Sequence, residues 1–433
     1  MSENEYIRST DPAVVEKLEW WRDQKFGVII HWGPYSQLGV FESWTLCQES
    51  DPWCRAPEPY VDDPEGYRAV YEKLPETFAA PAFDPKPWAE ACARAGMRYV
   101  VFTTKHHDGF AMYDTALSDY KITNTPLGRD AAGEVFAAFR GEGLAAGMYF
   151  SKPDWHHPDY WIPGRANPDR FANYSTADEP ERWERFKQFT HAQINELLTG
   201  YGPVDVLWLD GGWVKAPRED LDMAALAAAA RAAQPGILVV DREVRGPYED
   251  YRTPEQTVPD RLQPFPWESC VTLGPMWYTA GPYEQYKTVA EVIHLLCRIV
   301  ARGGNLLLGI GPDQTGALPS AVIERLAGVG AWLETHGAAI YATRPCAPFE
   351  ADGLLYTRTD DTVYAIGLLE PGQTVPEELR VAVSGVRPRR ARMLGHDVEI
   401  EIDTAPDSGG SDTLVLRIPP VPATHAFALA LEL

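Results

Sequence analysis

The sequence predicts an α/β protein, a (β/α)8-like TIM barrel that is partly distorted and is followed by a C-terminal antiparallel β-sandwich. Two observations predict it. From residue 20 to about residue 337 short apolar runs alternate with longer amphipathic segments, and after about residue 345 apolar and polar residues alternate singly. Repeated strand–helix units are typical of a barrel or of a doubly wound open sheet. Single alternation is typical of antiparallel strands. We therefore place the barrel at residues 1–343 and the sandwich at 344–433.

Six apolar runs have no polar face, as expected of parallel strands that are covered on both sides. They are Phe26–Trp32, Arg98–Thr104, Leu144–Ser151, Val204–Asp210, Ile237–Arg242 and Asn305–Gly311. The helical segments expected between and after them are Lys86–Ala95, Glu134–Arg140, Arg182–Leu198, Leu221–Ala233, Thr288–Ala301 and Ser320–Thr335. No GxGxxG or Walker motif occurs, which disfavours a nucleotide-binding open sheet. The irregular stretch Glu243–Ala280 has room for one or two further strands, so the barrel is favoured.

Length, charge and cysteine content exclude several classes of protein. A chain of 433 residues exceeds the size of one hydrophobic core, so we expect two domains. Its net charge of −23 repels phosphate backbones and anionic lipid, which excludes nucleic acid and membrane surfaces as favoured partners. The N-terminus lacks a secretory signal, which predicts a cytoplasmic protein, or a secreted one if the N-terminus has been trimmed. Six cysteines without a CxxC pair predict free thiols, with Cys47 and Cys54 as the exception most able to form a disulfide.

Candidate functional residues follow the apolar runs, because the active site of a parallel barrel lies at the carboxyl ends of its strands. They are His31, Trp32, His106, His107, Asp108, Ser151, Asp154, Trp208, Asp210, Asp241 and Arg242. Asp210 is the sharpest candidate, since it ends VDVLWLD and precedes two glycines. A rigidly held carboxylate suits a nucleophile, although an aspartate in this position can also cap a loop. The set predicts a polar pocket lined with aromatic rings.

The histidines allow a metal site as an alternative. His31, His106, His107 and Asp210 offer the ligand types that zinc prefers. However, adjacent histidines on a strand point to opposite faces, and no HxH pair occurs on the first strand. We therefore expect neutral histidines that hydrogen-bond a sugar, with no metal and no cofactor. Fourteen tryptophans also suit the apolar faces of sugar rings, although core packing is the more common role for any single one of them.

Seven strings in order give a specific resemblance. They are FGVIIHWGPYS, YVVFTTKHHDGF, VLWLDGG, VVDR, PWESCVTLGPMWYT, RGGNLLLGIGP and IYATRP. Together they resemble the α-L-fucosidase family of retaining glycoside hydrolases, glycoside hydrolase family 29, over residues 20 to 345. The resemblance implies a hydrolase that releases terminal α-L-fucosyl residues from fucosylated glycans through a covalent fucosyl-enzyme.

The resemblance also implies roles for individual residues. Asp210 corresponds to the nucleophile, and Trp277 falls where the family places an aromatic ring near the C5 methyl group of fucose. The other residues that match sugar contacts are His31, His106, His107, Trp208, Arg242, Trp44 and Glu42. This chain has Glu42-Ser43-Trp44 where many members have Glu-Trp, which weakens the match at Glu42 and Trp44.

Two glutamates of the irregular stretch are candidates for the general acid/base. Glu255 matches the proposed acid/base of several members of the family, whereas Glu268 belongs to the more recognisable PWESC motif. We favour Glu255 over Glu268, with Glu42 as a third candidate. Alternative functions are a fucose-binding protein without turnover and a metal-dependent barrel hydrolase. The sequence leaves open the fucosyl linkage and whether the protein forms a homo-oligomer.

Overall fold

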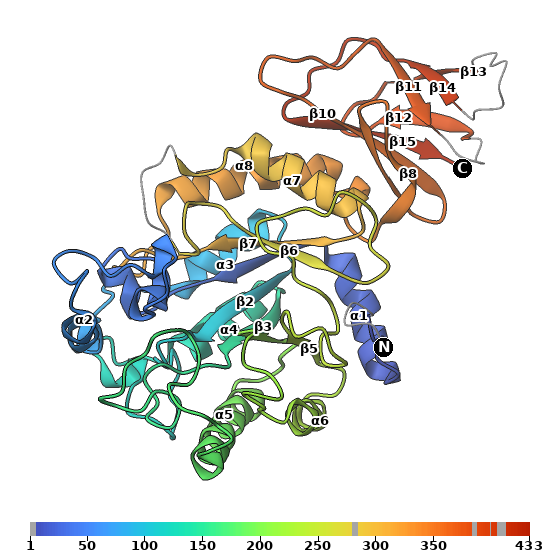
Figure 1. Ribbon diagram of the computed structural model, residues 1–433. Helices are drawn as coiled ribbons and strands as arrows, with labels where there is room; N and C mark the ends of the chain where they lie inside the picture. Colours follow the sequence, from blue (N-terminus) through green and yellow to red (C-terminus); the bar gives the residue numbers. More distant parts are fainter. Residues whose placement is uncertain (1–5, 279–284, 383–387, 399, 405–412) are drawn as a thin grey trace.

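A parallel β-sheet forms the larger part of the protein, in a computed structural model that describes residues 6–278, 285–382, 388–398, 400–404 and 413–433 (Figure 1). Its seven strands lie in the order β5-β4-β3-β2-β1-β7-β6. They are β1 (Phe26–Ile30), β2 (Tyr99–Lys105), β3 (Ala145–Ser151), β4 (Val206–Asp210), β5 (Leu238–Asp241), β6 (Glu268–Thr272) and β7 (Asn305–Ile310). Six of them match the six apolar runs of the sequence, and β6 lies in the irregular stretch.

The helices that pack against the outer face of this sheet are α3 (Pro85–Arg94), α4 (Ala131–Gly141), α5 (Pro180–Gly200), α6 (Met223–Ala233), α7 (Val289–Ala301) and α8 (Ser320–His336) (Figure 1). Two further helices, α1 (Pro12–Gln24) and α2 (Pro64–Tyr71), belong to other clusters. Side chains alternate along each strand, so Val28 and Ile30 join the helix layer while Ile29 joins the inner cluster. Burial of both faces explains why these strands have no polar side in the sequence.

Helix α1 was not expected from the sequence, and it closes one end of the inner cluster. Its buried Val14, Leu18 and Trp21 pack with side chains from inside the sheet. The Trp21 ring stacks on Tyr251 with 3.9 Å between centroids. Since the first strand begins two residues after α1 ends, the helix lies at the amino ends of the strands. The opposite end of the sheet, where the strands finish, is left for the functional site.

An irregular segment runs between the two edge strands β5 and β6. The Asp250 amide donates to the Val239 carbonyl of β5 at 2.9 Å. On the other side the Glu268 amide of β6 donates to the Arg252 carbonyl at 2.8 Å. This segment is not a regular strand, so the observed architecture is a curled seven-stranded parallel sheet with an irregular bridge.

The C-terminal region contains two antiparallel sheets. Their strands are β8 (Arg344–Ala351), β9 (Leu354–Arg358), β10 (Thr362–Leu368), β11 (Glu378–Ala382), β12 (Arg390–Met393), β13 (Glu401–Thr404), β14 (Thr413–Arg417) and β15 (Ala426–Glu432). One sheet has the order β12-β15-β10-β9-β8 and the other β11-β14-β13. A separate apolar cluster contains Tyr356 and Leu429 of the first sheet with Val381 and Leu416 of the second. Among the described residues, every helix is too short or too polar to cross a bilayer.

Candidate active site

Asp210 is the last residue of β4, and its side chain is held from two directions. Arg242 Nη1 donates to Oδ1 at 2.8 Å, and the Tyr149 hydroxyl donates to Oδ2 at 2.7 Å. Burial opposes ionisation of this carboxyl, but the Arg242 charge and these hydrogen bonds outweigh it and hold the pKa of Asp210 well below its usual range. The carboxylate is therefore ionised and aimed, as a nucleophile requires.

Three histidines lie beside this carboxylate. His31 follows β1, and His106 and His107 follow β2 directly. His107 Nε2 lies 3.8 Å from Asp210 Oδ2, and neither this atom nor the buried Nδ1 of His31 has a hydrogen-bond partner among the described residues. Burial lowers the pKa of His106 to about 4, and it also lowers those of His31 and His107. At neutral pH the three rings are uncharged, and the unpaired nitrogens of His31 and His107 can bond a hydroxyl group.

The adjacent histidines do not point in opposite directions, contrary to the expectation from strand alternation. Strand β2 ends at Lys105, so His106 and His107 lie beyond its pleat, and their ring centroids are 4.2 Å apart. Two serines orient them: Ser43 bonds His106 Nδ1, and Ser151 bonds His107 Nδ1 at 2.8 Å. A hydrogen bond at Nδ1 leaves Nε2 as the atom that faces the site.

A metal centre at these histidines receives no support from the geometry. Within the described parts of the chain, the group that could hold an ion contains Cys47, Glu49 and Cys54, and it includes no histidine. The Asp210 carboxylate is already bonded by Arg242 and Tyr149. These residues form a hydrogen-bonding site for a neutral polar ligand.

Arg242 joins the two carboxylates that the sequence singled out. It follows β5, with Nη1 on Asp210 and Nη2 on Glu255, whose side chain is 38% exposed. Glu255 is placed there by the irregular segment, which pairs with Cys270 of β6. One guanidinium therefore holds both carboxylates, and two neighbouring carboxyl groups are what a retaining glycosidase uses.

Glu268 is not brought to this site. It is the first residue of β6, whereas Asp210 is the last of β4, and its side chain is fully buried inside the sheet. It accepts hydrogen bonds from Tyr99 and, at 3.3 Å, from Trp208 Nε1. Burial raises the pKa of Glu268 to about 7. Full burial leaves Glu268 without the solvent access that Glu255 has, which favours Glu255 as the acid/base candidate.

Glu42 begins η2 (Glu42–Leu46) and is fully buried beside Trp277. Its Oε1 accepts a 2.9 Å hydrogen bond from the Trp277 amide, and its buried Oε2 has no side-chain partner among the described residues. Burial raises the pKa of Glu42 to about 8, so this carboxyl is largely protonated at neutral pH. Glu42 therefore both positions Trp277 and keeps a free oxygen for a ligand.

Aromatic rings border the polar groups, but they do not all reach the same depth. Trp277 lies 5.4 Å from the His31 ring and Trp44 lies 5.0 Å from the His107 ring, measured between centroids. Trp213 was noted in the sequence only as one of many tryptophans, and it lies 5.3 Å from His107. Trp208 is buried beneath the site, between Arg242 and Glu268. The first three rings form the walls and Trp208 forms the floor.

Sequence reasoning missed two groups that position the site. Tyr149, which bonds Asp210, lies inside the LAAGMYFS run and reads there as an ordinary apolar strand residue. Ser43, which orients His106, appeared only as an insertion between Glu42 and Trp44. Tyr149 could have been found from its position two residues before Ser151, because alternate strand residues share a face.

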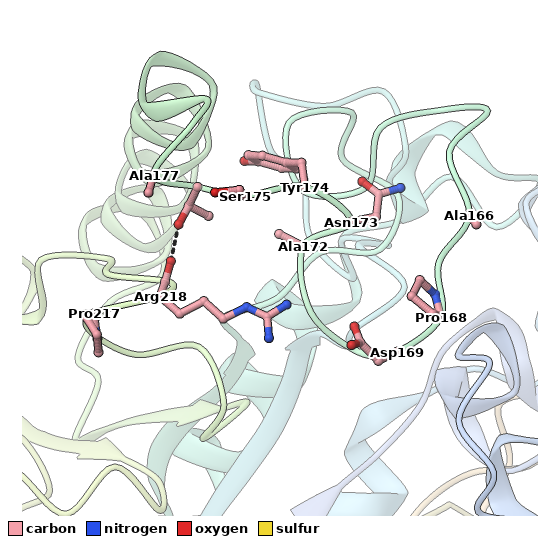
Figure 2. A pocket seen from close by; sticks show the side chains of 11 residues that line it. Ala166, Pro168, Asp169, Ala172, Asn173, Tyr174, Ser175, Ala177, Pro217 and Arg218 are labelled. Carbon is pink, nitrogen blue, oxygen red and sulfur yellow. Dashed lines mark hydrogen bonds between the residues drawn. The ribbon is translucent and has the colours of Figure 1, made fainter.

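A cavity of about 640 Å³ lies in the loops that follow β3 and β4, and Asp210 does not line it (Figure 2). The Thr176 hydroxyl bonds the Arg218 carbonyl at its edge, and the Arg218 guanidinium lies 3.8 Å from the Phe171 ring centroid. None of the predicted sugar-binding residues lines this cavity. The cavity is therefore formed by the loops and is separate from the site around Asp210 and Glu255.

A curled parallel sheet with Asp210 at a strand end and a second carboxylate on the same arginine, beside neutral histidines and aromatic rings, is typical of a carbohydrate-cleaving hydrolase. The comparisons with known proteins agree. The family model for alpha-L-fucosidase matches residues 1–338. The chain therefore belongs to the alpha-L-fucosidase family and is a glycoside hydrolase.

Relatives and solved structures extend this likeness over nearly the whole chain. Human tissue alpha-L-fucosidase is 29% identical over 433 residues, covering 95% of this chain and 88% of the relative. The structure of alpha-L-fucosidase isoenzyme 1 from Paenibacillus thiaminolyticus has a TM-score of 0.81 and 34% identity, covering 97% of this chain and 99% of that one. A trapped covalent intermediate of an alpha-L-fucosidase from Bacteroides thetaiotaomicron, in complex with 2-fluoro-fucosyl fluoride, has a TM-score of 0.79 and 25% identity, covering 99% and 97% of the two chains.

Proposed function

We propose that this protein hydrolyses terminal α-L-fucosyl residues of fucosylated glycans by double displacement, with Asp210 as nucleophile and Glu255 as general acid/base. The observation that carries the assignment of residues is the Arg242 guanidinium, which bonds both carboxylates at once. Family membership and the covalent intermediate of the Bacteroides thetaiotaomicron relative support the retaining route.

In the first step, Asp210 Oδ attacks the anomeric carbon while protonated Glu255 donates its proton to the departing glycosidic oxygen. The bond from the anomeric carbon to that oxygen breaks, and a fucosyl ester forms on Asp210. In the second step, ionised Glu255 takes a proton from water, whose oxygen displaces the Asp210 carboxylate. The same carboxyl thus acts first as acid and then as base.

Arg242 matches this exchange of charge. Before attack the negative charge resides on Asp210 and Glu255 is neutral. In the intermediate Asp210 is an uncharged ester and Glu255 carries the charge. A guanidinium with one nitrogen toward each carboxyl can neutralise whichever one is ionised, without moving.

The walls of the site account for recognition of a deoxy-sugar. The unpaired nitrogens of His31 and His107 and the free Oε2 of Glu42 suit the ring hydroxyls of fucose. The Trp277 ring supplies an apolar surface for the C5 methyl group. Contact with one methyl group gives only about 1–3 kcal/mol of selectivity, so exclusion of the extra hydroxyl of galactose must contribute as well.

Three finer proposals complete this account. The irregular segment between β5 and β6 takes the place of an eighth strand, which makes the sheet a distorted (β/α)8 barrel. The boundary between catalytic and C-terminal domains lies at residues 343 and 344. Loops 48–59 and 154–173, which follow β1 and β3, contact the leaving group and set the linkage preference.

The test is a panel of defined oligosaccharides with α-1,2, α-1,3, α-1,4 or α-1,6 fucose, together with an aryl α-L-fucoside. Release of free fucose, detected by chromatography, is the expected result. The initial product should have the α configuration in the proton NMR spectrum, because double displacement retains the anomeric configuration. A β-configured initial product, or binding of fucose without release, would contradict the proposal.

A further inference from the structure

Two cysteines meet on the loop that delivers three residues to the site. Cys47 follows η2, which carries Glu42, Ser43 and Trp44, and Cys54 ends η3 (Pro52–Cys54). Their sulfur atoms and a Glu49 carboxylate oxygen all lie within 4.8 Å of one another. The two sulfur atoms are therefore close neighbours. The catalytic account uses neither of them.

The arrangement suits a disulfide better than a metal ion. Arg170 forms a bidentate ion pair with the Glu49 carboxylate, with Nε donating to Oε1 at 2.7 Å and Nη2 donating to Oε2. A thiophilic ion would then find two sulfur ligands beside a guanidinium cation, whereas structural zinc sites use four ligands. Two thiols in contact, by contrast, need only an oxidant to be joined.

Cys54 has the character of the reactive partner. The neighbouring Cys47 side chain lowers the pKa of the Cys54 thiol, and the Arg170 charge acts in the same direction. Burial raises the pKa of Cys92, Cys270 and Cys297 instead. Solvent reaches only 3% of Cys54, but its neighbour Trp53 is 42% exposed, so the sulfur lies just beneath the surface. A small oxidant suits such a site.

We propose that Cys47 and Cys54 form a reversible disulfide on exposure to hydroperoxide, and that this bond fastens the loop bearing Trp44. The Cys54 thiolate attacks the terminal peroxide oxygen, the O–O bond breaks, and Cys54 becomes a sulfenic acid. The expelled alkoxide, or hydroxide from hydrogen peroxide, takes up the proton that the Cys54 thiol has lost. The Cys47 sulfur then attacks the Cys54 sulfur, the S–O bond breaks, and water leaves with the Cys47 proton. The two sulfurs together lose the two electrons that reduce the peroxide. A thiol or phosphine reductant reverses the reaction.

The loop connects this pair to the sugar site. The Cys47 amide donates to the Trp44 carbonyl at 2.9 Å. Arg170, held by Glu49 between the two cysteines, lies 4.8 Å from the Trp44 ring centroid, and Trp44 in turn contacts His107. Joining Cys47 to Cys54 therefore restrains Trp44 in its ligand-facing position. This consequence rests on the proposed function, whereas the disulfide itself does not.

The chemical test needs no activity measurement. Residues 26–55 contain no internal lysine or arginine, so trypsin releases Cys47 and Cys54 in one peptide. After treatment of the folded protein with a phosphine and alkylation under denaturing conditions, this peptide should carry two alkyl groups. After peroxide treatment the peptide should carry no alkyl group, and its mass should be that of the unalkylated dithiol peptide less two hydrogens. Reduction before alkylation should restore the doubly alkylated peptide. Cys92, Cys270 and Cys297 should stay alkylatable throughout and serve as internal controls.

Two outcomes would overturn the disulfide. One is that both thiols remain alkylatable after peroxide, and the other is their conversion to sulfinic acids without a cross-link. In Cys54→Ser, peroxide should leave Cys47 free to alkylate, while Cys346→Ser serves as the matched control and should cross-link like the wild type. Cross-linking that persists in Cys54→Ser through another cysteine would also contradict the assignment.

The kinetic test addresses the connection to the sugar site. Oxidation should lower KM for an aryl α-L-fucoside about threefold with little change in kcat, because restraining Trp44 reduces the entropy lost on binding. Cys54→Ser should show no response to peroxide. An unchanged KM in a protein shown by mass spectrometry to be cross-linked would refute the connection and leave the disulfide standing.

Discussion

Buried acidic side chains lie at both ends of the parallel sheet, but their surroundings differ. At the carboxyl ends, Asp210 and Glu255 share Arg242, and Glu255 remains 38% exposed. Glu268, the first residue of β6, is instead enclosed by hydrogen bonds from Tyr99 and from Trp208, whose ring forms the floor of the site. Membership of a recognisable sequence motif therefore does not by itself make a glutamate a catalytic candidate. Access to solvent and a link to the second carboxylate distinguish the catalytic candidate from the structural one.

Asp210→Ala should have the largest effect on activity. Removal of the nucleophile should lower kcat for an aryl fucoside by roughly 10⁴-fold or more, the range observed when covalent catalysts are deleted. Azide should restore part of the turnover by attacking from the vacated side and giving a fucosyl azide, detectable by mass spectrometry. Near wild-type turnover without azide would show that the carboxyl end of β4 is not where the chemistry occurs.

Glu255→Ala should show a smaller effect that depends on the leaving group. General acid–base groups contribute about 10²–10⁴-fold, so natural fucosides should slow within that range. Aryl fucosides with acidic phenols need little protonation, and their first step should slow far less. Glu243→Gln is the matched control, because this exposed carboxylate lies 3.7 Å from the same guanidinium. Equal losses from both variants would mean that Arg242, rather than acid catalysis, is being perturbed.

Trp277→Ala should mainly weaken recognition of the sugar. Loss of the apolar wall should reduce the preference for α-L-fucoside over the matching galactoside by about 10- to 100-fold, the value of a methyl-sized contact. The measurement is the ratio of the two kcat/KM values. Trp332→Phe, whose ring lies between α8 and β15, is a control outside the site. An unaltered ratio in Trp277→Ala would remove this ring from the specificity wall.

Glu268→Gln should have the smallest effect on activity and a visible effect on stability. Since burial raises the pKa of Glu268 to about 7, the folded protein holds this proton more tightly than the unfolded chain does. Its contribution to stability is complete below the unfolded pKa of about 4.3 and is lost as pH rises through 7. The glutamine variant should lack this component of the pH dependence, measured by urea unfolding at pH 4.5 and 7.5. A loss of turnover resembling that of Glu255→Ala would restore Glu268 as an acid/base candidate.

Much of the sheet and one half of the carboxylate pair could be predicted from sequence. Strands buried on both faces leave uninterrupted apolar runs, and Asp210 ends such a run, so its position followed from local pattern. The direction of His106 and His107 did not, because the end of β2 depends on pairing with a neighbouring strand. Helix α1 was missed as well, since its apolar face packs on side chains that are distant in sequence.

The choice between Glu255 and Glu268 lay beyond local pattern. Both belong to the stretch between β5 and the end of β6, where no periodicity marks the structure. Glu255 is brought toward Asp210 by a bridge to Cys270, and Glu268 is buried by hydrogen bonds to residues on β2 and β4. Such long-range contacts carry no short-range sequence signal.

The most direct test of the central claim is to trap the covalent intermediate. The protein should be incubated with 2-fluoro-fucosyl fluoride, digested with pepsin at low pH and mapped by tandem mass spectrometry. The account predicts one fluorofucosyl group, attached to the Asp210 side chain and absent from Asp210→Ala. A label on another residue, or the same label in the alanine variant, would contradict it.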